Sequence, residues 1–271
     1  MGKLARPLSV MGILNITPDS FSDGGHYNNV DDALRRAEAM INAGATWLDI
    51  GGESTRPGAE AVAEAEELDR VIPVLRAVKQ RLDAKVSVDT VKPAVMSAAI
   101  EAGVDMINDV NALREPGAIE AVAASNVEVC LMHMQGEPRT MQHDPRYEDV
   151  VCEVKTFLED RIQQCQRAGI EPSRIWLDPG FGFGKSQRHN YQMLQRLQAF
   201  HELRCPLLVG VSRKSMIGHV TGKTVDERLS GSIAAATIAA YKGARMIRVH
   251  DVAETVDAMR IVSATLEGDF L

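Results

Sequence analysis

The sequence predicts an α/β protein of the (β/α)8 class, a single-domain TIM barrel, from three observations. Eight short apolar runs occur along the chain, and a stretch with a helical pattern follows each of them. Short, strongly apolar strands that alternate with helices indicate a parallel sheet, because such strands are buried on both faces. The length of 271 residues is ordinary for one barrel, so we expect residues 1–271 to form a single domain.

Each run stops at or shortly before a polar or charged residue. The runs, each with the polar residues that follow it, are 10–14 (Asn15), 47–50 (Glu53), 86–88 (Asp89), 106–107 (Asn108), 127–132 (His133), 175–177 (Asp178), 207–211 (Ser212, Arg213 and Lys214) and 246–249 (His250). In this fold class the carboxyl ends of all strands share one face and carry the active site. The polar residues therefore mark the candidate site.

The junctions between helix and strand carry their own signals. Gly44, Gly103, Gly169 and Gly243 each stand just before a predicted strand, where a glycine is the usual left-handed residue at a helix end. The third unit, 86–104, is short, so its boundaries are less well defined than the others. Three connections after strands, 17–29, 51–60 and 180–188, are longer than such loops need to be, and long loops at this face usually bind ligands.

The predicted helix 229–241 is apolar on almost every side. Such a helix is normally buried, yet a barrel helix faces the sheet with one side only. We therefore expect its outer side to contact a second subunit, in a homodimer.

Composition excludes several classes of protein. The net charge of -7 argues against a nucleic-acid partner, which needs a basic face. No apolar stretch approaches the roughly 20 residues of a membrane span, and the first eight residues do not resemble a signal peptide. The four cysteines never form a CxxC pair, so neither zinc nor a disulfide framework is indicated. We expect a cytoplasmic protein without membrane partners.

The glycine-rich segment 180–186 (GFGFGKS) resembles a phosphate loop but does not match one. The Walker pattern needs glycine where Pro179 stands, and the dinucleotide fingerprint needs glycine where Lys185 stands. Two interpretations stay open: a flexible loop, or a hinge that presents Phe183 to a flat ligand. Neither a GxSxG elbow nor an HExxH helix occurs in the sequence, so hydrolase and zinc-protease functions have little support.

The polar residues divide into two chemical groups. Asp89, Asn108 and Asp178 each end a different strand, and a flat ring with several N–H groups on one edge would satisfy their acceptors. The alternative is that these carboxylates pair with arginines or cap helices. Arg248 and His250 lie two residues apart on one strand, so they share a side of the sheet and suit an anion with several oxygens.

Four segments in order resemble the signatures of one enzyme family. They are 11–25 (MGILNITPDSFSDGG), 51–58 (GGESTRPG), 178–185 (DPGFGFGK) and 212–215 (SRKS). On these residues the chain is identified as a member of the dihydropteroate synthases, with a match from about residue 11 to about residue 266. The resemblance implies a folate-pathway transferase that joins p-aminobenzoate to 6-hydroxymethyl-7,8-dihydropterin diphosphate, releasing diphosphate. It also implies Mg²⁺, a homodimer and competition by sulfonamides.

The resemblance also implies roles for individual residues. The expected pterin contacts are Asp89, Asn108, Asp178 and Lys214. The expected diphosphate contacts are Asn15, Thr55, Arg248 and His250, and Asn15 would also bind the metal. The expected p-aminobenzoate contacts are Phe21, Thr55, Arg56, Pro57, Phe183 and Ser215. Lys214, Arg248, His250 and Asp89 would carry the catalysis. Glu53 and His133 receive no ligand and are expected to fix loops.

The chemistry of these groups predicts a dissociative displacement. Loss of diphosphate leaves a cation that the pterin ring delocalises, and fixed cations stabilise the departing anion.

Three other functions are alternatives to the synthase. A corrinoid methyltransferase of the same superfamily would use similar carboxylates but has no diphosphate to hold. An aldolase would use Lys214 as a Schiff base, and a pterin-binding barrel without turnover would be expected to have lost some of Asn15, Lys214, Arg248 and His250.

Overall fold

The computed structural model describes residues 7–16, 26–54, 58, 61–137 and 140–268, with the side chains of 26–29 left out. Its strands are parallel and form one eight-stranded sheet in the order β6-β5-β4-β3-β2-β1-β8-β7. They are β1 (Ser9–Asn15), β2 (Trp47–Gly51), β3 (Lys85–Asp89), β4 (Met106–Asp109), β5 (Glu128–Met132), β6 (Ile175–Asp178), β7 (Leu208–Val209) and β8 (Met246–Val249). One bridge, Leu177 to Leu207, joins β6 to β7 and closes the ring. The predicted barrel is confirmed.

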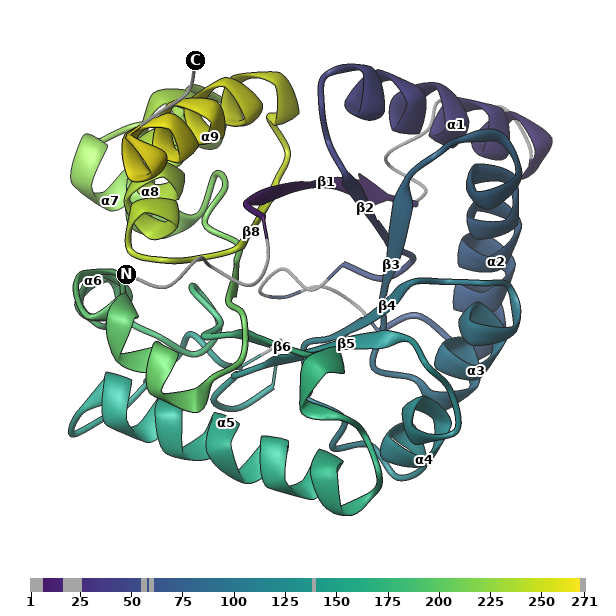
Figure 1. The fold of residues 1–271 in the computed structure, drawn as a ribbon, viewed down its shortest axis with the longest axis horizontal. Coiled ribbons are helices and arrows are strands. Elements are labelled where there is room, and N and C mark those ends of the chain that lie inside the picture. The colour runs from purple at the N-terminus through teal and green to yellow at the C-terminus, as the bar shows by residue number, and fades with distance from the viewer. Residues whose placement is uncertain (1–6, 17–25, 55–57, 59–60, 138–139, 269–271) are drawn as a thin grey trace.

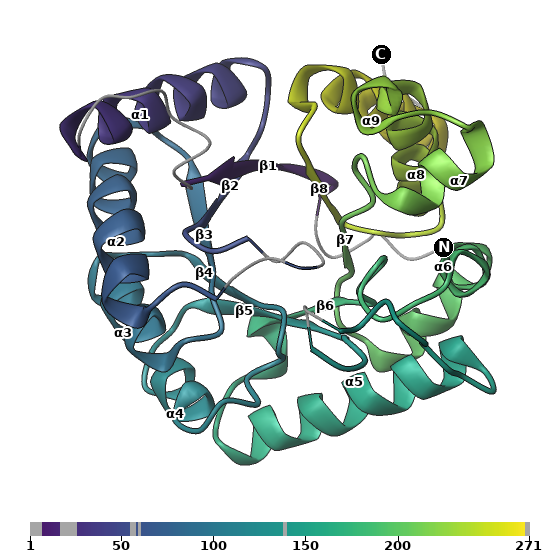
Figure 2. The same cartoon turned by 180° about the vertical axis from the view of Figure 1, so that it is seen from behind.

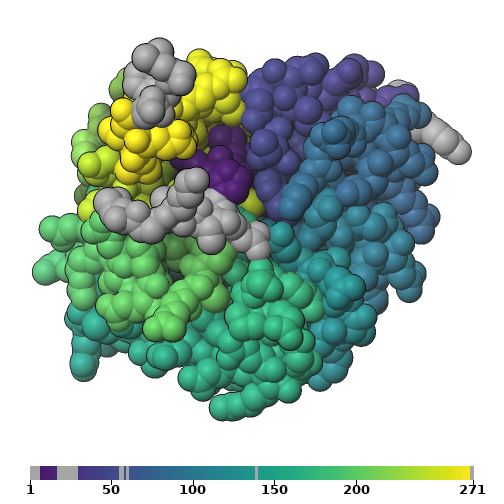
Figure 3. Space-filling model, viewed as in Figure 1, coloured from purple at the N-terminus to yellow at the C-terminus, as the bar shows by residue number. Residues whose placement is uncertain are grey.

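Helices surround the ring in the order of the chain (Figures 1 and 2). They are α1 (His26–Asn42), α2 (Glu64–Arg81), α3 (Pro93–Glu101), α4 (Ala118–Ala123), α5 (Val150–Arg167), α6 (Gln187–Gln195), α7 (Ser215–Thr221), α8 (Leu229–Tyr241) and α9 (Val252–Glu267), with 3-10 turns η2 (Pro172–Arg174), η3 (Leu197–Leu203) and η4 (Val225–Glu227). The colours in Figure 3 follow one another around the molecule, because each unit packs beside the next one along the chain.

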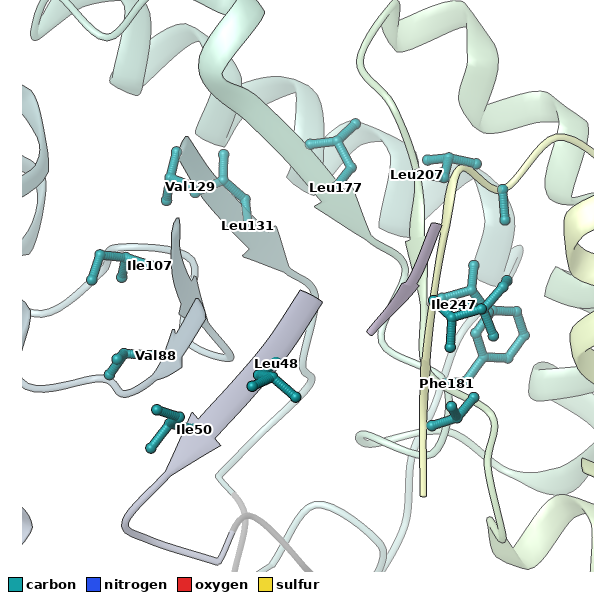
Figure 4. Close-up of a cluster of buried hydrophobic side chains, with 14 of the residues drawn as sticks. Leu48, Ile50, Val88, Ile107, Val129, Leu131, Leu177, Phe181, Leu207 and Ile247 are labelled. Atoms are coloured by element: carbon teal, nitrogen blue, oxygen red, sulfur yellow. The ribbon is translucent and has the colours of Figure 1, made fainter. Parts of the chain in front are cut away.

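Two side-chain layers hold the barrel. On the outside of the strands, aliphatic residues such as Leu48, Ile107 and Leu177 pack against the helices (Figure 4). Alternate residues point inward, since successive strand side chains face opposite sides. The inward set forms a separate floor of Met11, Trp47, Met106, Cys130, Trp176, Leu208 and Met246. This apolar floor fills the lower barrel, and the inward side chains of Asp49, Asp89, Asn108 and Arg248 lie above it.

Most sequence-based boundaries agree with the structure, and the differences are local. Gly44, Gly103, Gly169 and Gly243 all have positive φ, as expected of residues that end helices. The first long loop is shorter than predicted, because α1 already begins at His26. The second is longer, because α2 begins only at Glu64. None of the helices in the described residues is long and apolar enough to span a bilayer.

Candidate active site

The centre of the barrel mouth is an ion cluster around Arg248, which projects inward from β8. Its Nε donates to Asp49 Oδ2 at 2.5 Å and its Nη2 donates to Asp89 Oδ2 at 2.9 Å. Asn108 Nδ2 donates to the same Asp49 oxygen at 3.3 Å. β2, β3, β4 and β8 therefore meet in one polar layer directly above the apolar floor.

Burial determines the electrostatics of this cluster. It raises the pKa of Asp89 to about 7, although the positive charge of Arg248 acts in the opposite direction. Burial likewise disfavours the charge on Arg248, but Asp49 and Asp89 outweigh it and raise the pKa of the guanidinium. The alternative weighed from the sequence, in which a carboxylate pairs with an arginine, is thus correct for Asp89.

Asp49 is the residue that sequence reasoning missed. It is fully buried, it accepts from both Arg248 and Asn108, and its Oδ1 has no hydrogen-bond partner among the described residues. The signal was present in the sequence: a carboxylate interrupts the apolar run 47–50 at an inward position, two residues after Trp47. A charge in the middle of a doubly buried strand is costly and needs a reason.

The opposite wall of the mouth comes from β6 and the segment after β7. Asp178 Oδ1 accepts from the Gly180 amide at 2.7 Å, and burial raises the pKa of its carboxyl. Lys214 donates to the carbonyl of Phe181, and its Nζ lies 4.5 Å from the centre of the Phe183 ring. Burial lowers the pKa of Lys214 to about 8, against the attraction of Asp178. Phe183 also packs against a second apolar cluster of Val91, Val110, Met132, Met134 and Met141.

The glycine-rich loop is tied to its neighbours by side-chain hydrogen bonds on two sides. The Gly182 amide donates to Asn190 Oδ1 at 2.7 Å, Gln142 donates to the Gly182 carbonyl, and Tyr147 donates to the Gly184 carbonyl at 2.8 Å. These side chains come from α6 and from the segment before α5. The loop therefore presents Phe183 in one defined position.

Replacing Gly180 by alanine is expected to unfold this loop locally and to reduce activity strongly. Gly180 has a φ of +72°, and a Cβ there would lie 1.9 Å from the His133 carbonyl oxygen. Gly169→Ala is the matched control, because φ is +89° but nothing lies within 4 Å of the added carbon. We expect about 1–2 kcal/mol of destabilisation for the control, from backbone strain alone. Urea unfolding should show a clearly larger loss for Gly180→Ala, and equal losses would contradict the proposed clash.

The remaining predicted residues lie in different places. His250 Nδ1 lies 3.1 Å from the Ser212 hydroxyl, which also accepts from the His250 amide at 3.2 Å. Asn15 ends β1 opposite Gly51 of β2, with Oδ1 3.8 Å from the position of a Cβ added at Gly51. Ser215 is the first residue of α7 and is exposed. Phe21, Thr55, Arg56 and Pro57 fall outside the residues that the structure describes.

Glu53 has the loop-fixing contacts expected of it. Its carboxylate and that of Glu67 on α2 both accept from Lys92 Nζ. Burial alone would lower the pKa of Lys92, but these two hydrogen bonds raise it. Arg70 donates to the Gly52 carbonyl at 2.8 Å and holds the same segment. The start of the loop after β2 is therefore anchored to α2 and to the residue before α3.

Comparison with known proteins shows the family to which this fold and sequence are similar. The family model described as pterin-binding enzyme matches residues 11–250. The dihydropteroate synthase of Escherichia coli K12 is 58% identical over 259 residues, which are 96% of this chain and 92% of the relative. The Yersinia pestis dihydropteroate synthase in a sulfonamide drug complex superposes with a TM-score of 0.92 at 55% identity, covering 98% and 96% of the two chains. The Xanthomonas albilineans dihydropteroate synthase in complex with 7,8-dihydropteroate gives 0.87 at 48% identity, covering 97% and 95%.

Proposed function

The chain belongs to the pterin-binding enzymes and, among them, to the dihydropteroate synthases, and from this membership we propose how its own residues carry the reaction. It is a transferase that condenses 6-hydroxymethyl-7,8-dihydropterin diphosphate with p-aminobenzoate to give 7,8-dihydropteroate and diphosphate. One observation carries the assignment of roles: buried carboxylates and an amide face the cations Arg248 and Lys214 across a single barrel mouth. We also propose that residues 1–271 form one pterin-binding domain.

The pterin is proposed to lie against Asp89, Asn108 and Asp178. An amino group beside a ring N–H offers two parallel donors, which a carboxylate accepts well, and Asn108 supplies both a donor and an acceptor. Asp178 is opposite the cluster and close enough to Lys214 for the two charges to interact. Asp49 is added as a positioning residue, because it orients both Arg248 and Asn108.

The leaving diphosphate is proposed to lie at Arg248, His250 and Asn15, with Thr55 from the loop after β2. Asn15 offers a neutral carbonyl oxygen, and the described residues contain no group of three or more His, Cys, Asp or Glu side chains that could hold a metal ion. That donor set fits Mg²⁺, which keeps most of its water and binds through few protein oxygens plus substrate phosphates. When bound, Mg²⁺ would neutralise charge on the diphosphate. The Ser212 hydroxyl contacts His250 Nδ1 and holds the imidazole at the carboxyl end of β8, where the diphosphate is proposed to bind.

The proposed displacement is dissociative. The bond between the pterin methylene carbon and the diphosphate oxygen breaks first, and its electron pair leaves with the diphosphate. Asp89 and Asp178 oppose the positive charge that spreads over the ring, while Arg248 stabilises the anion. The aniline nitrogen then attacks the methylene carbon and loses a proton to water. Because the nucleophile is a neutral amine, the site needs no strong general base.

p-Aminobenzoate is proposed to lie between Phe183 and the loops after β1 and β2, with Phe21, Thr55, Arg56, Pro57 and Ser215 as further contacts. Phe183 stands at the edge of the apolar cluster and under Lys214, which suits an aromatic ring that carries an anion. A sulfonamide of similar shape would compete for this position. The Yersinia pestis relative with a sulfonamide drug supports that extension.

The experiment is an assay with the pterin diphosphate, Mg²⁺ and p-aminobenzoate, followed by chromatography of the products. We expect dihydropteroate and diphosphate in equal amounts, and a strong loss of rate when a chelator removes the metal. A second arm omits p-aminobenzoate and measures diphosphate release over several hours. Slow release would support the dissociative order, whereas folded protein that forms no dihydropteroate would refute the function.

A homodimer is proposed from the outer side of α8. Leu229, Ile238 and Tyr241 are exposed, with Tyr241 at 60% and Ile238 at 44%. Ile238 and Tyr241 are three residues apart and therefore neighbours on the outer side of the helix. Replacing Ile238 by glutamate should shift the protein to monomers, because a second copy would have to bury the new charge. Sedimentation velocity at micromolar concentration measures this. A wild-type protein that sediments as a monomer would contradict the proposal.

A cytoplasmic location is proposed as well. The four cysteines are free thiols, and the three in the interior are Cys130, Cys165 and Cys205. Free thiols are usual in a reducing compartment. Fractionation of cells that express the natural protein would test this, with recovery outside the cytoplasm as the opposing result.

A further inference from the structure

One buried cation has no role in the chemistry described above. Lys185 ends the glycine-rich loop and is only 1% exposed. Its Nζ lies 2.9 Å from His133 Nδ1, 3.0 Å from the Phe183 carbonyl oxygen and 3.3 Å from the His133 carbonyl oxygen. An ammonium group has three hydrogens and only donates, so these three acceptors match it.

Burying the Lys185 amine costs free energy, which a side chain that only filled space would not need to spend. Burial lowers the pKa of Lys185 well below its usual value, and no carboxylate accepts a hydrogen bond from it in the described residues. A methionine of similar length would fill the same volume without the cost of desolvating an amine. The hydrogen bonds themselves must therefore matter, and they join the segment after β5 to the loop after β6.

His133 is suited to accept. Burial, together with the neighbouring Lys185, lowers the pKa of His133 to about 2, so its ring is neutral. In the tautomer that carries the proton on Nε2, Nδ1 has a lone pair that accepts from Lys185. The ring is held edge-on against Phe157 of α5, with centroids 4.9 Å apart. Packing against Phe157 therefore fixes the His133 ring, whose Nδ1 faces Lys185.

The loop that Lys185 fixes carries two groups that contact Lys214. The Phe183 carbonyl accepts from Lys185 while the Phe183 ring faces Lys214, and the Phe181 carbonyl accepts from Lys214. A shift of the loop by 1 Å would move the aromatic ring and one acceptor together. Asp89 and Asn108, the proposed pterin contacts on β3 and β4, come from the other wall and would stay in place. Lys214, proposed to contact both substrates, would lose one acceptor.

We infer that Lys185, seated on His133, is a positioning residue that sets where Phe183 meets p-aminobenzoate. The inference rests on the proposed function, and it makes the Lys185–His133 pair contribute more to the affinity of the second substrate than to that of the pterin. His133, which ends a strand at the active-site face, acts through Lys185 and not on a substrate.

The test compares two substitutions that remove the contact with one that keeps it. Lys185→Met removes the donors, and His133→Leu removes the acceptor. His133→Asn places an amide oxygen near the position of Nδ1 and should restore the contact. Leu158→Ala, in the buried face of α5, is the control for lost stability without a change at the loop.

The readouts are KM for p-aminobenzoate, kcat, and the affinity for 6-hydroxymethylpterin measured by calorimetry without turnover. We expect KM to rise about tenfold or more in Lys185→Met and His133→Leu, as misplaced binding groups typically cause. The pterin affinity should fall by a smaller factor than KM rises, because Asp89 and Asn108 lie on the other wall. His133→Asn should return KM most of the way to the wild-type value. Leu158→Ala should melt at a lower temperature with an unchanged KM.

Several results would overturn the inference. An unchanged KM in folded Lys185→Met would do so, as would a parallel loss of pterin affinity, which indicates a general structural role. If Lys185→Met does not fold, the comparison of His133→Leu with His133→Asn decides, and equal KM values for the two refute the inference. Wild-type protein that makes no dihydropteroate would instead refute the proposed function, since pterin calorimetry does not depend on turnover.

Discussion

Arg248→Met is expected to lower kcat/KM by roughly 10²–10³-fold, because it removes a preorganised cation from the site where diphosphate leaves. It should also destabilise the fold. Without the guanidinium, Asp49 and Asp89 remain as two buried carboxylates, and breaking a buried ion pair from one side costs about 3–5 kcal/mol. Urea unfolding followed by the fluorescence of Trp47 and Trp176 measures this loss at the barrel floor itself.

The destabilisation should depend on pH in a defined direction. Burial already raises the pKa of Asp89 to about 7, well above that of an ordinary aspartate, and removing Arg248 raises the pKa further. A carboxyl with a raised folded-state pKa costs no stability below its unfolded pKa, and the full cost appears above the folded one. The variant should therefore differ most from the wild type near pH 8 and least near pH 4.

Two further variants make this expectation specific. Adding Asp49→Asn to Arg248→Met removes one unpaired charge and should restore part of the stability while leaving activity low. Arg245→Met is the control, since Arg245 is also a buried arginine but precedes β8 at the opposite end of the barrel. A loss of stability in Arg248→Met that stays constant from pH 5 to pH 8 would contradict the role assigned to the two carboxylates.

Lys214→Met is expected to weaken both substrates. The lysine lies over the Phe183 ring and interacts with Asp178, so one substitution affects the p-aminobenzoate side and the pterin side. A charge-assisted hydrogen bond contributes about 1.5–3 kcal/mol, which corresponds to a loss of roughly 10–100-fold in affinity. Steady-state KM and pterin calorimetry measure the two effects separately. Lys223→Met, on the exposed segment after α7, is the control and should leave both unchanged.

The pH profile gives Lys214 a second signature. Because burial lowers its pKa to about 8, the ammonium loses its proton as pH rises through that value. Activity of the wild type should accordingly fall above about pH 8. Lys214→Arg keeps its charge at all these pH values, so its residual activity should lack this decline. A decline of the same shape in Lys214→Arg would assign the titration to another group.

The fold could be predicted from the sequence because strand burial leaves a direct mark. Doubly buried parallel strands appear as apolar runs, and the residue after each run lies at the active-site face by topology alone. Helix α8 was predicted to the residue, since its apolar composition contrasts with the charged segment before it. Boundaries that depend on loop packing, such as the start of α2, were less accurate because nothing in the local pattern ends the loop.

The site could be predicted only where residues follow a strand. Asp89, Asn108 and Asp178 met that condition, whereas Asp49 lies inside a strand and was read as part of an apolar run. Its role depends on Arg248, 199 positions away in the sequence, and a single sequence does not reveal such a pairing. Lys185 was missed for a related reason: the loop pattern shows glycines and a lysine, but not the histidine on the neighbouring strand end.

The single bridge between β6 and β7 gives the ring one weak seam. Asp178 stands on one side of it and Lys214 on the other, so the groups proposed for the pterin straddle the join. A ligand held by both would act as a clamp across the seam, and its binding energy would add to the stability of the closed ring by mass action. If the proposed contacts are correct, the pterin would help to hold the barrel closed, and the ligand-free enzyme would be the state in which β6 and β7 separate most easily.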